Sequence, residues 1–185
     1  TQSVHAGSVG DPVFGGITNP IYTASAYNYE ETVRYPRYFN TPNQDAVVKK
    51  MVALENAEDG IVFGSGMASI LTSMFAILKT GDHIIFQNDL YGGTHFAAFQ
   101  QLSRYGIDFT MVDAADPGNF EKAIRKETKV IYVESPSNPL RRVTDLSAVA
   151  KIAKQHGFIS SLTQHFASPF KPNPVYPWYN VFCNI

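Results

Sequence analysis

Three short polar stretches of this 185-residue chain contain the residue types of a ligand site. The first, Ser65-Gly66-Met67, follows an apolar run and opens directly into a helical pattern. A helix that begins at such a turn presents free backbone N–H groups and the positive end of its dipole, which suits a phosphate or another anion. Gly-rich turns are also common as plain connections between a strand and a helix.

Tyr91 and Asn138 are the side chains that could meet the rest of such a ligand. Tyr91 precedes the Gly92-Gly93 hinge, and a tyrosine can stack on a ring and also donate or accept a proton. Asn138 lies in a turn between two prolines. Taken alone, each residue also fits a structural role, as a sheet-edge aromatic and as a turn residue. Together with the anion site they predict a pocket for a phosphorylated aromatic cofactor.

Alternating strands and helices are expected to bring these stretches together. The expected strands are Gly60–Phe63, His83–Phe86, Phe109–Val112, Lys129–Val133 and Phe158–Leu162. The expected helices are one capped by Asn43, then Met67–Lys79, Phe96–Tyr105 and Phe120–Arg125, and one capped by Thr144 or Asp145 that ends near His156. This alternation predicts an α/β fold with a mostly parallel sheet and helices on both faces. Ligands bind beyond the carboxyl ends of such strands, where the polar stretches lie.

Residues 1–43 show little periodicity, because glycines and prolines interrupt them and aromatic side chains lie between. Such a segment cannot easily form its own core. We therefore expect an extended arm that lies on its own domain or on a partner subunit.

Composition excludes several classes of function. A hydrophobic content of 44%, a charged content of 17% and a net charge of −1 are typical of a soluble globular protein and favour neither nucleic acid nor a membrane surface as partner. The single cysteine, Cys183, excludes an internal disulfide framework and favours the cytoplasm. The five histidines have no metal-ligand spacing, so no metal is expected. The chain also lacks the G-x-S-x-G and G-K-[ST] motifs of hydrolases and NTPases.

Four ordered motifs resemble one enzyme family. They are Tyr35-Pro36-Arg37, Phe63-Gly64-Ser65-Gly66-Met67-Ala68, Asp89-Leu90-Tyr91-Gly92-Gly93-Thr94 and Glu134-Ser135-Pro136-Ser137-Asn138-Pro139. They are similar to the Cys/Met-metabolism family of pyridoxal-phosphate enzymes, which includes cystathionine γ-synthase, cystathionine lyases, methionine γ-lyase and O-acetylhomoserine sulfhydrylase. The resemblance extends over about residues 1–162. It implies a PLP-transferase-like large domain of the aspartate-aminotransferase type I, with an arm at 1–43 and an incomplete large domain at 44–185 that lacks the C-terminal domain.

The resemblance also implies a role for each site residue. The turn at Ser65, Gly66 and Met67 would hold the phosphate of pyridoxal 5'-phosphate. Tyr91 would stack on the pyridine ring and transfer a proton at the leaving group, and Asn138 would lie near the cofactor hydroxyl and the substrate carboxylate. Tyr35 and Arg37 would reach the phosphate in a neighbouring subunit of a homotetramer, a dimer of dimers with shared sites.

Two parts of the family pattern are missing. Thr163 stands at the position of the aspartate that keeps the ring nitrogen protonated, and a hydroxyl cannot supply that negative charge. The Schiff-base lysine is expected a few residues beyond Ile185, and Lys171 matches no family lysine. The segment Tyr176–Ile185 fits the family poorly. We therefore expect a chain truncated before the lysine, which depends on association for its stability.

The resemblance implies C–S elimination or γ-replacement on cystathionine, homocysteine or O-acyl-homoserine type substrates, a step of cysteine and methionine metabolism. Gly93, at a position where methionine γ-lyases carry a cysteine, favours a cystathionine-type activity. One alternative is a catalytically inactive cofactor-binding or interaction fragment. Another is a nucleotide-binding doubly wound domain, for which Asp89 is the only acidic candidate to hold a ribose.

Overall fold

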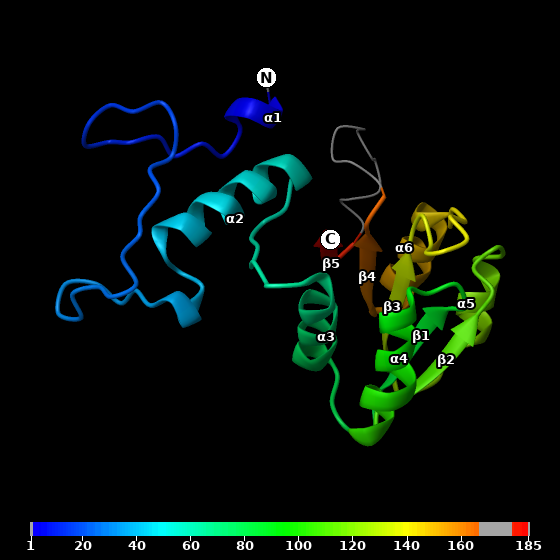
Figure 1. Cartoon of the computed structure of the whole chain (residues 1–185). Coiled ribbons are helices and arrows are strands. Elements are labelled where there is room, and N and C mark those ends of the chain that lie inside the picture. Colours follow the sequence, from blue (N-terminus) through cyan, green and yellow to red (C-terminus); the bar gives the residue numbers. More distant parts are fainter. Residues whose placement is uncertain (1, 167–178, 185) are drawn as a thin grey trace. The chain divides into compact units, whose positions relative to one another are not determined.

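The computed structural model describes residues 2–166 and 179–184, and the chain divides into two units, Thr1–Phe63 and Gly64–Ile185 (Figure 1). Lys171 and residues 176–178 of the segment Tyr176–Ile185 lie outside the described residues. None of the helices in the described part of the chain has the length and apolar composition needed to cross a bilayer.

The first unit contains α1 (Gln2–His5), a 3-10 turn at Pro36–Tyr38 and α2 (Pro42–Glu55). The prediction that Asn43 caps α2 is wrong. Thr41 is the cap, because its side chain accepts the N–H of Gln44 while the Gln44 side chain accepts the N–H of Thr41. The side chain of Asn43 instead bonds both backbone groups of Tyr22, at 2.9 and 2.6 Å.

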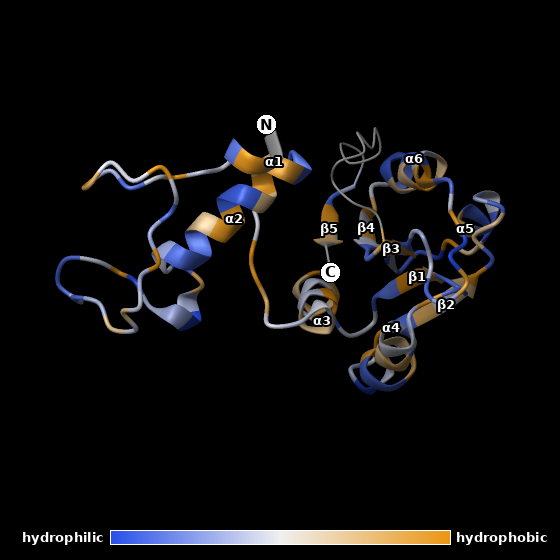
Figure 2. Cartoon of the chain, turned by 45° about the horizontal axis from the view of Figure 1, so that its top comes forward, coloured by the Kyte–Doolittle hydropathy of each residue, from blue (hydrophilic) through white to orange (hydrophobic). Residues whose placement is uncertain are grey.

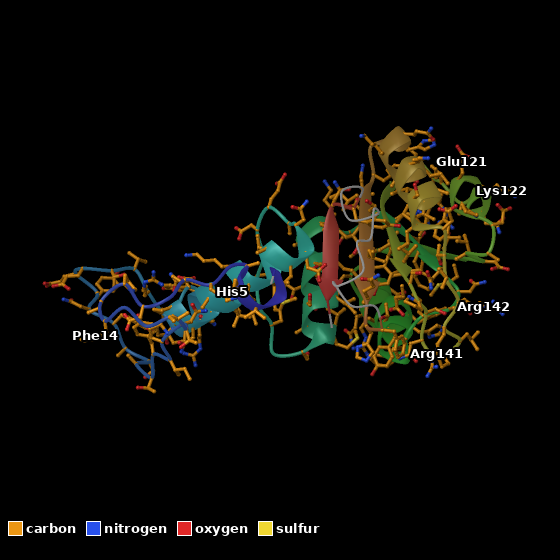
Figure 3. All side chains as sticks on the ribbon, turned by 90° about the horizontal axis from the view of Figure 1, so that it is seen from above. His5, Phe14, Glu121, Lys122, Arg141 and Arg142 are labelled. Carbon is orange, nitrogen blue, oxygen red and sulfur yellow. The ribbon has the colours of Figure 1, made fainter. Side chains whose placement is uncertain are left out.

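Between α1 and Pro36 the first unit has no regular element, and many of its large apolar side chains are exposed. Phe14 is 90% exposed and points outward from this unit in Figure 3. The most exposed of the others are Val13, Ile17, Ile21, Tyr29 and Val33. Covering these side chains with another protein surface would remove apolar area from water and stabilise the segment.

The second unit is built on five parallel strands in the order β2-β1-β3-β4-β5 (Figure 1). They are β1 (His83–Gln87), β2 (Asp108–Val112), β3 (Thr128–Glu134), β4 (Ile159–Gln164) and β5 (Val181–Asn184). This sheet confirms the predicted α/β class. The prediction of a strand at Gly60–Phe63 is wrong, because these residues form no strand and pair with none of the strands of the described sheet. β5 was not predicted, and it lies in the segment that fits the family pattern poorly.

Helices cover both faces of this sheet (Figure 2). They are α3 (Gly66–Ile77), α4 (Gly92–Phe96) with the π-helical turn Ala97–Leu102, α5 (Gly118–Lys122) and α6 (Leu146–His156). Because successive strand residues point to opposite faces, Phe86 and Tyr132 pack with α3 and the π-helical turn, whereas Ile85 and Ile131 pack with α5 and α6. Two buried apolar layers therefore fix the strand ends at which the polar stretches lie.

His83, at the start of β1, is a buried histidine that should make the second unit sensitive to acid. Its ring nitrogens lie 2.8 Å from Thr128 Oγ1 and 2.9 Å from Thr110 Oγ1. Burial, and then the nearby Arg125 guanidinium, lower the pKa of His83 below its ordinary value near 6.5. The unfolded chain therefore binds this proton more readily than the folded one, so stability should be lost as the pH falls below 6.5, by at most about 1.4 kcal/mol per pH unit.

Urea unfolding between pH 7 and pH 5 measures this loss. His83→Gln should flatten the acid side of the stability profile, and the same change at the exposed His95 is the matched control. A His83→Gln profile as steep as that of the parent would contradict the assignment.

Candidate functional site

A cavity of about 310 Å³ lies at the carboxyl ends of the strands of the second unit. Its wall is formed by Ser65, Gly66, Met67, Ile70, Tyr91, Glu134, Pro136, Asn138, Thr163 and His165. The fold thus brings five of the seven predicted site residues to one cavity: Ser65, Gly66, Met67, Tyr91 and Asn138. The other two, Tyr35 and Arg37, belong to the first unit, where Arg37 donates a hydrogen bond of 2.6 Å to the Tyr35 hydroxyl.

The N-terminus of α3 forms one wall of the cavity. Ser65 has an extended backbone, with φ −160° and ψ 156°, and its hydroxyl accepts the N–H of Ala68 at 3.2 Å. Helix geometry leaves the N–H groups of Gly66 and Met67 without an intrahelical acceptor. Because α3 has 12 residues, its aligned peptide dipoles add positive potential at this end. This wall is therefore suited to an anionic group such as a phosphate.

Tyr91 stands at the mouth of the cavity, with 47% of its surface exposed. Its backbone N–H donates to Glu134 Oε2 at 2.7 Å, and the Thr94 hydroxyl donates to Glu134 Oε1 at 2.8 Å. A carboxylate at the end of β3 therefore holds the start of α4. A side-chain carbon added at Gly93 would lie 2.7 Å from Tyr91 Cε1 and 2.8 Å from Met67 Sδ, so only glycine allows this close packing.

Gln87, at the end of β1, links the backbone of Glu134 to the turn before Tyr91. Its amide nitrogen donates to the carbonyl oxygens of Asp89 and Glu134, at 2.7 and 2.9 Å, and its amide oxygen accepts the Glu134 N–H at 3.1 Å. Arg142 makes an ion pair of 3.2 Å with Asp89 in the same turn. The turn is thus held by Gln87 and by Arg142.

Glu134 and Tyr132 are the titratable groups at the base of the site. Burial raises the pKa of the Glu134 carboxyl, and hydrogen bonds from Tyr91 N–H, Thr94 and Tyr132 oppose that shift. Burial, and then the neighbouring Glu134 charge, raise the pKa of the Tyr132 hydroxyl well above its ordinary value. That hydroxyl also lies 2.7 Å from Thr163 Oγ1. Tyr132 is therefore a neutral phenol.

Sequence reasoning gave no role to four of the residues that line the cavity: Ile70, Glu134, Pro136 and His165. The sequence did contain a signal for Glu134. A carboxylate at the buried end of an apolar strand needs hydrogen-bond donors around it, so a polar site could have been expected there. Within the described residues, no cluster of three or more His, Cys, Asp or Glu side chains is arranged to hold a metal ion. No lysine is among the described residues that form the cavity wall.

Comparison with known proteins gives a consistent result. A family model described as Cys/Met metabolism PLP-dependent enzyme matches residues 1–177. A cystathionine gamma-lyase of Bacillus subtilis is 36% identical over 179 residues, which cover 95% of this chain and 47% of the relative. A probable cystathionine gamma-synthase of Herpetosiphon aurantiacus is 33% identical, with 95% of this chain and 56% of the relative covered. The chain thus spans about half the length of the curated relatives it matches.

Solved structures agree with these relatives. Cystathionine gamma-lyase from Lactobacillus plantarum, complexed with L-serine, superposes with a TM-score of 0.85 at 38% identity, covering 91% of this chain and 45% of that one. A putative O-acetylhomoserine (thiol)-lyase from Campylobacter jejuni has a TM-score of 0.82 at 29% identity, with the same two shares covered. The Campylobacter structure carries N'-pyridoxyl-lysine-5'-monophosphate.

Proposed function

Because this chain belongs to the Cys/Met-metabolism family of pyridoxal-phosphate-dependent enzymes, we propose that the cavity at its strand ends is the cofactor site. We propose further that the whole protein carries out C–S elimination or γ-replacement on sulfur amino acids such as cystathionine. The relatives support this activity, because they are cystathionine lyases and a probable cystathionine γ-synthase. The observation that carries the proposal is the joint presence of the α3 N-terminus and Tyr91 in one cavity.

The residues present fit the phosphate and the ring of the cofactor. Gly66 and Met67 would bind the phosphate through their backbone N–H groups, and Tyr91 would stack on the ring. Asn138 would donate from its amide to the cofactor hydroxyl or to the substrate carboxylate. Pyridoxal phosphate, when bound, supplies an electron sink for a carbanion beside the substrate amino group.

Tyr91 is the residue that we assign to proton transfer. Its exposed hydroxyl can hold a proton at the mouth of the cavity and release it to a leaving sulfur or oxygen atom. The Glu134 carboxylate accepts the backbone N–H of Tyr91 and so fixes the position of that backbone, while the phenol ring can still rotate about its side-chain bonds. Since no lysine is among the described lining residues, no covalent attachment step is assigned to this part of the chain.

The first unit would contribute across a subunit interface. We propose that residues 1–43 act as an arm and residues 44–185 as an incomplete cofactor-binding domain, and that Tyr35 and Arg37 reach the phosphate site of a neighbouring subunit in a homotetramer. The many exposed apolar side chains of the arm support an association that covers them. Arg37 has the fork geometry that suits a phosphate. A cytoplasmic location is part of this proposal, because the single cysteine is free and buried.

The experiment is a titration of the full chain with pyridoxal 5'-phosphate and, in parallel, with pyridoxal. Tighter binding of the phosphate ester by a factor of ten or more is expected, since charge-assisted bonds from the α3 amides contribute about 1.5–3 kcal/mol. Equal binding of the two compounds would contradict the site.

The residues that line the cavity favour a second function, which is reversible binding of the cofactor without catalysis. The lining contains Thr163 and, among the described residues, no lysine. Borohydride reduction of the loaded chain separates the two functions. A cofactor that becomes covalently attached supports the enzyme, and a cofactor that washes out supports the binding protein.

Gly93→Ala should weaken binding of pyridoxal 5'-phosphate about tenfold, because the new methyl group must displace the Tyr91 ring or Met67. Gly92→Ala is the matched control, since a side-chain carbon there meets nothing within 4 Å. Direct titration of the two variants measures the difference. Equal affinity would show that Tyr91 does not contact the ligand.

A further inference from the structure

The loop that follows β3 places an arginine, Arg141, beside the cavity. The backbone N–H of Arg141 donates to the Ser137 carbonyl oxygen at 2.8 Å, and the Ser137 N–H donates to the Arg142 carbonyl oxygen at 2.9 Å. The Ser137 hydroxyl also accepts the Arg142 N–H at 3.1 Å, and Ser137 is fully buried. Because Asn138 in this loop lines the cavity, the hydrogen bonds around Ser137 hold Arg141 close to the cavity edge.

The backbone of Arg141 has a left-handed conformation, with φ 54°. Residues other than glycine rarely adopt it, because their Cβ atom then lies close to the backbone. Such strained residues persist where the surrounding contacts hold them, and they are concentrated at ligand sites. Here the hydrogen bond to Ser137 holds a strained arginine at the border of the cavity.

The Arg141 guanidinium lies over an aromatic ring that follows the next strand, β4. Its central carbon is 5.6 Å from the centre of the Phe166 ring, which is within the range of a cation–π contact. Phe166 is 48% exposed and directly follows His165, which lines the cavity. The guanidinium is therefore positioned at the mouth of the cavity, near Asn138 and His165. A guanidinium stacked on a ring still presents N–H donors along its edge.

Arg141 and its neighbour Arg142 differ in their partners. Both side chains are exposed at the surface of the second unit (Figure 3). Arg142 makes the ion pair of 3.2 Å with Asp89. Within the part of the chain that the structure describes, Arg141 forms no ion pair with a carboxylate. Arg141 thus adds a positive charge at the mouth that these residues do not neutralise.

We propose that Arg141 binds a carboxylate at the far end of the substrate side chain. This inference rests on the proposed function, because it takes the phosphate and the ring of the cofactor to occupy the cavity. A substrate beside that ring reaches the mouth with the far end of its side chain, where the guanidinium fork matches a carboxylate. The favoured substrate is an amino acid with a second carboxylate, such as cystathionine. Homocysteine, which lacks that group, is disfavoured.

The test uses two stable probes that contain the phosphate and the ring of the cofactor but no aldehyde. Each is an N-(5'-phosphopyridoxyl) derivative of an L-homocysteine thioether. The sulfur carries a 2-carboxyethyl group in one probe and a 2-carbamoylethyl group in the other, so the two differ mainly in the charge of the far end. Calorimetric titration of the full chain gives both affinities. The acid should bind about fivefold more tightly than the amide, as for an exposed ion pair with good geometry.

Arg141→Gln should abolish the preference for the acid and leave the affinity for the amide unchanged, which shows that the variant folds and keeps the cavity. Arg141→Lys keeps the charge without the fork and should retain about a twofold preference. Arg104→Gln is the matched control, because it removes the same charge from an exposed arginine at the far end of the helical run that begins at Gly92. This control should keep the full preference. An Arg141→Gln chain that keeps it as well would overturn the inference.

Salt provides a second measurement on the parent chain. The ratio of the two affinities cancels the contribution of the phosphate, so its salt dependence reports the far end of the probe. The preference should fall when the salt concentration rises from about 0.05 M to about 0.5 M, since an exposed ion pair is screened. A preference that stays constant with salt would contradict the ion pair.

The two probes also separate this inference from the proposed function. If both bind with equal affinity, the inference is overturned alone, because the phosphate and the ring are still held. If neither binds, the proposed cofactor site is overturned and the inference falls with it.

Discussion

Phe86→Ala should lower the free energy of unfolding of the second unit by about 3–5 kcal/mol. Phe86 is fully buried on β1, and its ring centroid lies 6.3 Å from that of Phe109 and 5.3 Å from that of Tyr132. Truncation removes the ring from the layer under α3 and leaves a void, because the two flanking strands prevent collapse. Urea unfolding followed by circular dichroism measures the loss.

Phe96→Ala is the matched control for this change. Phe96 ends α4 and is 58% exposed, so its removal should change stability by less than about 0.5 kcal/mol. Similar losses in the two variants would mean that the layer between α3 and the sheet does not carry the stability of this unit.

Gly66→Pro should reduce the affinity for pyridoxine 5'-phosphate by about tenfold to a hundredfold, because proline removes one N–H donor at the first position of α3. Proline is tolerated at this helix position, and the extended backbone of Ser65 is compatible with a following proline. The loss should be specific to the phosphate ester, so the affinity for pyridoxine, which lacks the phosphate, should change little. Titration of both compounds gives the comparison.

Gly66→Ala separates loss of the donor from loss of the glycine, because alanine keeps the N–H group. If Gly66→Pro binds the phosphate ester as tightly as Gly66→Ala, the phosphate does not lie at the N-terminus of α3. A melting temperature measured for each variant shows whether α3 still forms.

Local signals in the sequence determined much of the second unit. The alternation of apolar runs and helical patterns predicted β1 to β4, because strands buried on both faces need continuous apolar residues. Ser65 and Asp145 lie at the starts of helices where a side-chain oxygen accepts a backbone N–H, and that bond needs only neighbouring residues. The order of polar stretches after strands likewise predicted which residues line the cavity.

Strand pairing was decided by the tertiary structure. Gly60–Phe63 has the composition of a strand and forms none, whereas Val181–Asn184 forms β5 because β4 offers its edge. A strand is stable only when a neighbour satisfies its backbone groups, and a local pattern does not contain that neighbour. The prediction that Asn43 caps α2 was wrong for a related reason, since the Asn43 side chain bonds the backbone of Tyr22, which is distant in the sequence.

The contacts at the base of the cavity were also decided by the tertiary structure. Tyr132 and Thr163 are 31 positions apart in the chain, and each is unremarkable in its own segment. Only the pairing of Glu134 with Thr163 places a carboxylate, a phenol and a hydroxyl in one row. The sequence therefore determined the family and the turn at the start of α3, which depend on adjacent residues. The tertiary structure decided which side chains meet at the base of the cavity, because those contacts cross from one strand to the next.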